Sequence, residues 1–183
     1  MKNLIVSLIL AATLINTPEL VAAQAPQQGT IAQQSIGEAE IRSLMSRFDA
    51  AIRAKDSKGL AALFYDGQIN WKATGHPKSR EFIAQMSKQE IRALEDQGAH
   101  QLIGDPAYKA LRLAENFGPP TIVSDGQLAT VTFRYNFTAN DQIQNWGSES
   151  WQLVKAEDGW KIVNLLFSYT LTEVAPMPDG HLK

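Results

Sequence analysis

Three segments near the C-terminus have the composition of long β-strands, and they constrain the fold more than any other feature. Residues 127–138, 146–155 and 160–169 are rich in aromatic and β-branched side chains, the types that pack best on a pleated sheet. Ala-Glu-Asp-Gly at 156–159 separates the last two, and an Asp-Gly pair readily adopts the positive φ angles of a tight hairpin. The sequence therefore predicts three consecutive antiparallel strands.

The length and charge of the chain are those of one globular domain. Its 183 residues are 44% hydrophobic and 20% charged, with a net charge of −2, so nucleic acid is not an expected partner. The chain contains no cysteine, which excludes disulfides, thiolate metal sites, cysteine nucleophiles and a lipidated cysteine.

The first 23 residues have the pattern of a cleaved signal peptide. Lys2 precedes an apolar run over residues 4–15, which is too short to span a bilayer. Val21-Ala22-Ala23 places small residues where a signal peptidase reads them, so we expect cleavage after Ala23. The alternative is an uncleaved N-terminal anchor. The mature protein is then expected in a bacterial periplasm or outside the cell, with no membrane contact.

The remaining chain divides into three predicted parts. These are a flexible lead-in over residues 24–34, one folded domain over 35–172 and a C-terminal tail over 173–183. A Ser-Ile-Gly-Glu capping box at 35–38 is predicted to begin the first helix, because its Ser and Glu side chains can satisfy free backbone amides.

Shorter signals predict the elements between this helix and the three strands. A second helix is expected to begin near Asp56 or Ser57, and a first strand to cover residues 68–74. Ser79 is predicted to cap a third helix, which a second capping-box pattern over 87–90 would interrupt and restart. Two interpretations of the region 98–120 remain open: a helix that starts at Asp105-Pro106, or an edge strand over residues 108–115.

The order of these elements resembles the nuclear transport factor 2-like superfamily, and above all its SnoaL-like branch. The resemblance covers roughly residues 35–170. The segments that carry it are FDAAI at 48–52, LAALF at 60–64, Trp71, ESWQLV at 149–154, DGWKI at 158–162 and Phe167-Ser168. It implies an α+β, cone-shaped domain whose N-terminal helices pack on a strongly curved antiparallel sheet and enclose one pocket. It also implies a homodimer formed through the outer sheet face.

Strand alternation agrees with such a sheet. Along residues 127–138, Phe133 and Tyr135 share one face and Arg134 lies on the other. The last strand is apolar on both predicted faces, with Trp160, Ile162 and Leu166 opposite Val163, Leu165 and Phe167. A strand of this kind needs cover on both sides, which we expect from the helices and from a second subunit.

Acid–base chemistry in the pocket would need a carboxyl, imidazole or phenol group. The catalytic candidates are Asp66, His76 and Tyr135, with Tyr169 as a further possible group. Asp66 lies where the second helix meets the first strand, and can equally be a turn residue. His76 lies in a Gly-His-Pro turn, and can equally be a solvated loop residue.

The ligand-binding candidates are Trp71, Arg134, Trp146, Glu149 and Trp151. Glu149 shares a strand face with Trp151, which makes it either a carboxyl group with a perturbed pKa or an exposed residue at the rim. Arg134 either fixes a carboxylate or enolate in the pocket, or contacts solvent or a partner. For both Glu149 and Arg134, the sequence leaves these alternatives open.

No complete catalytic set of the superfamily is present, and no motif indicates a metal or cofactor. Of the three histidines, one lies in the tail, so neither a metal site nor a cofactor is expected. The leading hypothesis is an exported domain that binds a small, largely apolar molecule in a conical pocket. The alternatives are a cofactor-independent isomerase, cyclase or dehydratase of the SnoaL-like type, and a dimeric assembly module with a vestigial pocket.

Overall fold

The computed structural model describes residues 30–96 and 103–183. The predicted signal peptide and its cleavage site lie outside the described residues. Within them, seven strands form one mixed sheet in the order β2-β1-β7-β6-β5-β3, with β4 paired to β5. The strands are β1 (Trp71–Gly75), β2 (Glu95–Asp96), β3 (Leu113–Phe117), β4 (Thr121–Ser124), β5 (Leu128–Ala139), β6 (Gln142–Ala156) and β7 (Gly159–Leu171).

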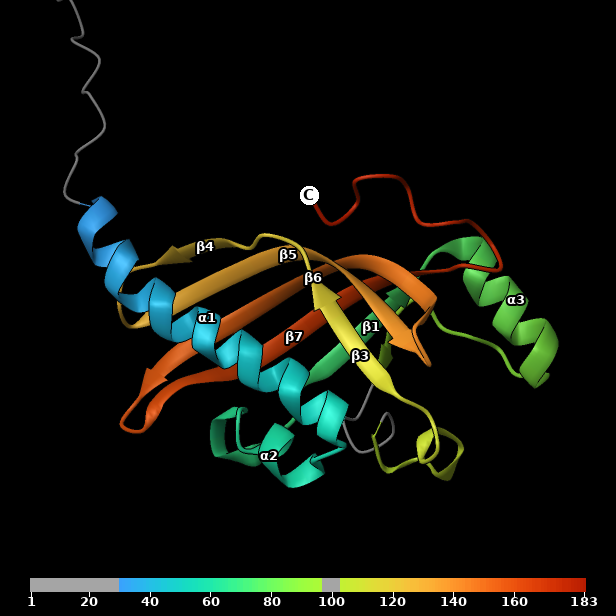
Figure 1. Ribbon diagram of the computed structural model, residues 1–183, viewed down its shortest axis with the longest axis horizontal. Coiled ribbons are helices and arrows are strands. Elements are labelled where there is room, and N and C mark those ends of the chain that lie inside the picture. Colours follow the sequence, from blue (N-terminus) through green and yellow to red (C-terminus); the bar gives the residue numbers. More distant parts are fainter. Residues whose placement is uncertain (1–29, 97–102) are drawn as a thin grey trace, which may run out of the picture.

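The described helices are short apart from the first. They are α1 (Thr30–Ala54), α2 (Ser57–Ala61) and α3 (Pro77–Ser87), with 3-10 turns η1 (Tyr65–Gly67) and η2 (Pro106–Tyr108). Figure 1 shows α1 lying across one face of the curved sheet, with α3 at one end of it. None of the described helices has the length and apolarity that crossing a bilayer requires.

The three predicted C-terminal strands are confirmed as an antiparallel meander of β5, β6 and β7. A two-residue turn, Glu157-Asp158, joins β6 to β7, and Gly159 follows it with a φ of 118°, a conformation that favours glycine. The predicted α+β class is also confirmed. The expectation of an antiparallel sheet needs one correction, because β1 pairs parallel to β7.

Helix α1 buries one apolar stripe against the sheet. Ile41, Leu44, Phe48 and Ile52 are fully buried along it, at the three- and four-residue spacing of one helix face. The Phe48 ring centroid lies 5.3 Å from that of Trp71 and 4.8 Å from that of Trp151. The helix begins at Thr30 and not at the capping box predicted over residues 35–38.

A bulge in β7 changes the faces that simple alternation predicts for this strand. Gln152 pairs with Asn164 while the next residue, Leu153, pairs with Ile162, so Val163 is the extra residue. A bulge reverses the in–out pattern beyond it. Leu165 is therefore buried with Ile162, whereas Val163 and Leu166 are 40% and 37% exposed, and the predicted grouping of these side chains is wrong.

Two further predictions about helices are wrong. His76, and not Ser79, caps α3, since its side chain accepts a hydrogen bond from the Lys78 amide. Ser79 is buried, and its hydroxyl accepts from the Leu171 amide. The helix ends at Ser87, and no helix restarts before β2. Of the two interpretations for 98–120, each is right in part: Asp105 caps η2, and an edge strand, β3, follows it.

The C-terminal segment packs against the sheet face opposite α1. After β7 it turns back toward β5 and β6 (Figure 1). The Trp146 indole donates to the Ala175 carbonyl at 3.0 Å, and the His181 ring lies edge-on to it at 5.0 Å. His181 Nε2 is 3.0 Å from the carbonyl oxygen of Gly147. The predicted tail is therefore a docked segment that covers part of the outer face.

Gly147 is the position where β6 approaches β7 too closely for a side chain. A Cβ atom there would lie 1.9 Å from the Ser168 carbonyl oxygen. We expect Gly147→Ala to lower the free energy of unfolding by about 3 kcal/mol, since this backbone must move. Gly37→Ala in α1 is the matched control: its Cβ would meet only ordinary contacts at 3.4 Å and beyond.

Urea denaturation of both variants checks the prediction. Gly37→Ala should raise stability by about 0.5–1 kcal/mol through helix propensity. Equal stability of wild type and Gly147→Ala would contradict the close approach of the two strands.

Candidate functional site

A largely apolar cavity with a volume of about 480 Å³ lies inside the curve of the sheet. Its walls come from every strand of the sheet except β4, from helix α3 and from the turn η2, and most of the lining side chains are aromatic or aliphatic. Three carboxyl side chains, Glu95, Glu115 and Glu173, also line it, whereas none of the described lining residues is Lys, Arg or His. The cavity is thus apolar and acidic.

Glu115 and Glu149 form a buried pair of carboxyl groups at this cavity. Glu115, on β3, lines it directly, and Glu149 lies on β6. They are only 5% and 2% exposed, and they reach each other across β5, whose Phe137 pairs with Glu115 and whose Phe133 pairs with Glu149. Alternation brings both side chains to the face on which α1 packs.

Two neighbours hold the pair in place. The Trp151 indole donates to Glu149 Oε2 at 2.6 Å, and the Glu115 amide donates to Asp49 Oδ1 on α1 at 3.1 Å. Oε1 of Glu149 and Oε2 of Glu115 have no hydrogen-bond partner among the described residues. Since the two carboxyl groups contact each other and buried polar atoms are nearly always paired, a proton on one of them would join the pair by a hydrogen bond.

Burial sets the protonation of the pair. It raises the pKa of Glu149 to about 7, although the contacts with Glu115 and Trp151 partly oppose the shift. The pKa of Glu115 is raised well above its ordinary value, first by burial and then by the nearby charge of Glu149. Two contacting carboxylates cannot both ionise easily, and the pair therefore keeps a proton to a higher pH than an ordinary carboxyl group, with burial and the charge of Glu149 favouring Glu115 as its holder.

Tyr135 is a wall of the cavity whose hydroxyl already has partners. It donates to Asn145 Oδ1 at 2.9 Å and lies 3.1 Å from the Ser168 carbonyl oxygen. Burial is the main cause that raises its pKa, so the phenol stays protonated. Tyr169, also in the cavity, donates to Glu95 at 2.8 Å, and burial followed by that contact raises its pKa.

The structure brings together some of the predicted site residues and separates others. Trp71 and Tyr135 line the cavity, with Glu149 and Trp151 directly behind Glu115. Asp66 and His76 are exposed and do not line it. Asp66 lies in η1 with a φ of 50°, the conformation of a turn residue.

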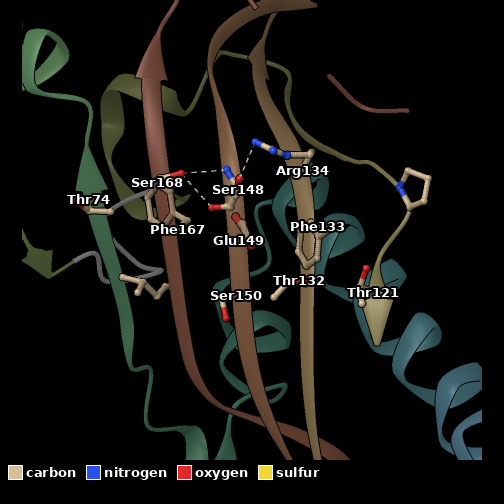
Figure 2. Close-up of a pocket in the computed structure, with 12 residues that line it drawn as sticks. Thr74, Thr121, Thr132, Phe133, Arg134, Ser148, Glu149, Ser150, Phe167 and Ser168 are labelled. Carbon is tan, nitrogen blue, oxygen red and sulfur yellow. Dashed lines mark hydrogen bonds between the residues drawn. The ribbon is translucent and has the colours of Figure 1, made fainter. Parts of the chain in front are cut away.

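Arg134 and Trp146 lie on the opposite side of the sheet. Figure 2 shows Arg134 on an outer groove, where it donates to the Ser148 hydroxyl at 3.2 Å. Of the two directions left open for Arg134, the structure shows the one that points away from the cavity. Trp146 is half-buried beneath the C-terminal segment.

Glu115 is the residue that sequence reasoning missed. It lies within residues 98–120, for which the sequence predicted either a helix or an edge strand. The sequence feature that could have revealed it is its position two residues after Leu113 and two before Phe117. In a strand, this spacing places Glu115 on the same face as two apolar side chains. No group of three or more His, Cys, Asp or Glu side chains among the described residues is arranged to hold a metal ion.

Comparison with known proteins points to one family. A family model for a SnoaL-like domain matches residues 33–165, and no curated protein matches the chain. A protein of unknown function from Mycobacterium tuberculosis is 17% identical, with 82% of each chain covered and a TM-score of 0.57. A nuclear transport factor 2-like protein from Salmonella enterica is 24% identical, with 80% of this chain and 95% of that chain covered and a TM-score of 0.51.

A third solved structure comes from Novosphingobium aromaticivorans and carries a proposed assignment as a scytalone dehydratase. It is 13% identical, covers 76% of this chain and 88% of its own, and has a TM-score of 0.54. At these identities the three structures show a common fold. The cone-shaped architecture expected from the resemblance is therefore confirmed.

The buried pair makes stability depend on pH in a particular direction. Since folding raises the pKa of Glu149 from 4.5 to about 7, its contribution is fully present below pH 4.5 and is lost as pH rises through 7. We expect the free energy of unfolding to fall over this window by on the order of 3 kcal/mol. Glu149→Gln should show a smaller fall and exceed the wild type in stability at pH 8.

Denaturation in urea between pH 4.5 and 8 checks this dependence. Glu157→Gln, at an exposed position in the hairpin turn, is the control and should follow the wild type. A wild-type stability that rises with pH across this window would contradict the buried pair.

Proposed function

The chain belongs to the SnoaL-like family of the nuclear transport factor 2-like superfamily, and from that premise we propose that it binds a small, largely apolar molecule and transfers protons on it. The cavity of about 480 Å³ is the binding site, and Glu115 is the proton-transferring group. The reaction class is a cofactor-independent isomerisation or elimination. This proposal joins the binding function expected from the sequence with its enzymatic alternative.

One observation carries the proposal: a buried carboxyl group lines an apolar cavity and is hydrogen-bonded to a second buried carboxyl group behind it. The first group is Glu115 and the second is Glu149. A carboxyl group is a useful general acid near neutral pH only when its pKa is raised, and burial together with Glu149 has this effect on Glu115. If this cavity only bound apolar molecules, burying two carboxyl groups at its wall would cost free energy without a benefit.

The neighbours of Glu115 suit each stage of a proton transfer. The charge of Glu149 keeps the proton on Glu115 until a ligand atom accepts it. When Glu115 has donated, it becomes a carboxylate and can remove a proton from another atom of the same molecule. One proton given and one proton taken leave the composition of the molecule unchanged, which is an isomerisation. If the donated proton goes to a hydroxyl group that leaves as water, the same two transfers give a dehydration. The hydrogen bond from Trp151 holds Glu149 in place throughout.

A probe reaction tests the role of Glu115 without knowledge of the natural substrate. In 5-nitrobenzisoxazole, removal of the ring C–H proton by a base breaks the N–O bond and gives a coloured phenolate. We expect the protein to accelerate this elimination, increasingly so toward alkaline pH as Glu115 ionises. Glu115→Gln should lower the rate about 100-fold, a loss typical of a removed general base.

Three further variants make the assay specific. Glu173→Gln is the matched control, because it alters an exposed carboxylate at the same cavity and should keep full activity. Asp66→Asn and His76→Ala test the two exposed candidates from the sequence. Full activity of Glu115→Gln would overturn the proposal, and loss of activity in either exposed variant would return the catalytic role to that residue.

Export and self-association are part of the proposed function. The predicted cleavage after Ala23 would release the domain into the periplasm or the medium. The outer sheet face would then support a homodimer, because Val163 and Leu166 leave apolar surface exposed and Leu166 lines the groove of Arg134. Exposed apolar surface of this kind favours association.

Native mass spectrometry of the protein from its own cells tests these properties together. We expect a subunit mass that lacks residues 1–23, twice that mass for the assembly, and a bound small molecule. Leu166→Asp should give a monomer, whereas Met86→Asp, on exposed α3 surface, should stay dimeric. A retained N-terminus would contradict export, and a wild-type monomer at micromolar concentration would contradict the dimer.

A further inference from the structure

A series of hydrogen bonds links helix α1 to the C-terminal segment across the edge of the sheet. On α1, the Arg53 side chain donates to Asp49 Oδ2 at 2.6 Å and to Asn116 Oδ1 on β3 at 3.2 Å. The Asn116 amide donates to Asn136 Oδ1 on β5 at 2.8 Å, and the Asn136 amide donates to the sulfur of Met177 at 3.5 Å. These five side chains form what we call the edge network.

The place of β3 in the sheet makes the edge network possible. Asn116 follows Glu115 on this strand, so the two side chains point to opposite faces. Glu115 points to the face on which α1 packs, whereas Asn116 points to the other face together with its strand partner Asn136. The Arg53 side chain reaches Asn116 from α1 because β3 is the last strand at this end of the described sheet.

The contacts of Arg53 lie beside the buried pair of carboxyl groups. Asp49, Arg53, Glu115 and Asn116 all line a groove of about 680 Å³ between α1 and the end of β3. Glu115 is nevertheless only 5% exposed, and its amide donates to Asp49 at 3.1 Å. The hydrogen bonds of Arg53 thus join α1 to β3 at the place where water could reach the Glu115 carboxyl group.

The C-terminal segment holds the other end of the edge network. Asn136 is only 4% exposed, and its amide has Met177 of this segment as its acceptor. The segment itself is fastened by His181, whose Nε2 lies 3.2 Å from the Tyr135 carbonyl oxygen and 3.0 Å from that of Gly147. Release of the segment would take this acceptor from Asn136 and loosen the network behind it.

We propose that the C-terminal segment positions the buried pair, because it keeps α1 closed on β3 and water away from Glu115. It acts through the hydrogen bonds of Asn136, Asn116 and Arg53, and networks of this kind can couple distant groups. Asn116 and Asn136 are therefore positioning residues. This rests on the proposed function, since it names what controls the proton-transferring group of the same site.

The surroundings of Glu115 give the direction of the expected effect. Burial is the first cause of its raised pKa, followed by Glu149 on β6 and then Asp49 on α1. Since burial leads, entry of water should lower the pKa toward its ordinary value. Six further ionisable side chains line the cavity or the groove, and every variant below keeps them: Arg42, Glu95, Tyr108, Tyr135, Tyr169 and Glu173.

Titration of the two carboxyl groups tests the proposal. In protein labelled with ¹³C at the glutamate carboxyl carbons, the signals that are missing in Glu115→Gln and Glu149→Gln identify the pair. In the wild type, Glu149 should titrate with a midpoint of about 7. Asn116→Ala, which breaks the edge network, and removal of residues 174–183 should each lower this midpoint by about one pH unit.

Asn164→Ala on β7 is the matched control. Asn164 is half-buried like Asn116 and belongs to the same sheet, but it is not part of the edge network, so its titration should equal that of the wild type. If the shortened chain does not fold, His181→Ala replaces it. This variant loosens the segment without removing it, and should lower the midpoint as well.

The pH dependence of the 5-nitrobenzisoxazole reaction gives a second measurement. In Asn116→Ala, the rise in rate toward alkaline pH should begin about one pH unit lower than in the wild type, because the base ionises earlier. A variant that was merely less stable would lose rate without this shift.

The outcomes separate this proposal from the proposed function. An unchanged or raised midpoint in folded Asn116→Ala, or in the shortened chain or its replacement, would overturn the positioning role of the segment. An equal shift in Asn164→Ala would overturn it as well. A wild type that does not accelerate the probe reaction would overturn the proposed function, while the carboxyl titration would still decide this inference.

Discussion

The contact of the Phe48 ring with the sheet is the interaction on which the rest of the structure depends. This fully buried side chain of α1 packs against Trp71 of β1, Trp151 of β6 and Phe117 of β3. It thereby joins three strands that are not neighbours in the sheet. Aromatic contacts of this kind add to the free energy gained by burial. They also keep water away from the polar groups behind them.

The carboxyl pair takes its chemistry from this dry surrounding. Trp151 contacts the Phe48 ring on one side and donates to Glu149 through its indole nitrogen. The carboxylate of Asp49, the residue after Phe48, accepts a hydrogen bond from the backbone amide of Glu115. The same helix turn therefore packs the core and fixes the acid pair, so a change in packing at Phe48 would alter the pKa of both carboxyl groups.

The sequence predicted those parts of the fold that local pattern controls. The β5–β7 meander follows from alternation and turn chemistry. The start of α2 at Ser57 follows from capping, because the Asp56 side chain accepts a hydrogen bond from the Gly59 amide. Predictions failed where tertiary contacts decide: the Val163 bulge reverses the faces of β7, and Ser79 is held by the backbone of Leu171 instead of capping α3. Glu115 was missed because β3 is a short edge strand, whose pairing with β5 carries little local signal.

The parallel pairing of β1 with β7 has a consequence for how the chain folds. These two strands lie far apart in the sequence. Residues 71–75 pair with residues 165–169 on one side and only with the two-residue strand β2 on the other. Helix α1 and β1 therefore have no complete sheet to pack on until the last strand is present. A contact between such distant segments carries a large loop-closure entropy and forms slowly. The cavity wall that holds Trp71 would thus be completed among the last parts of the domain.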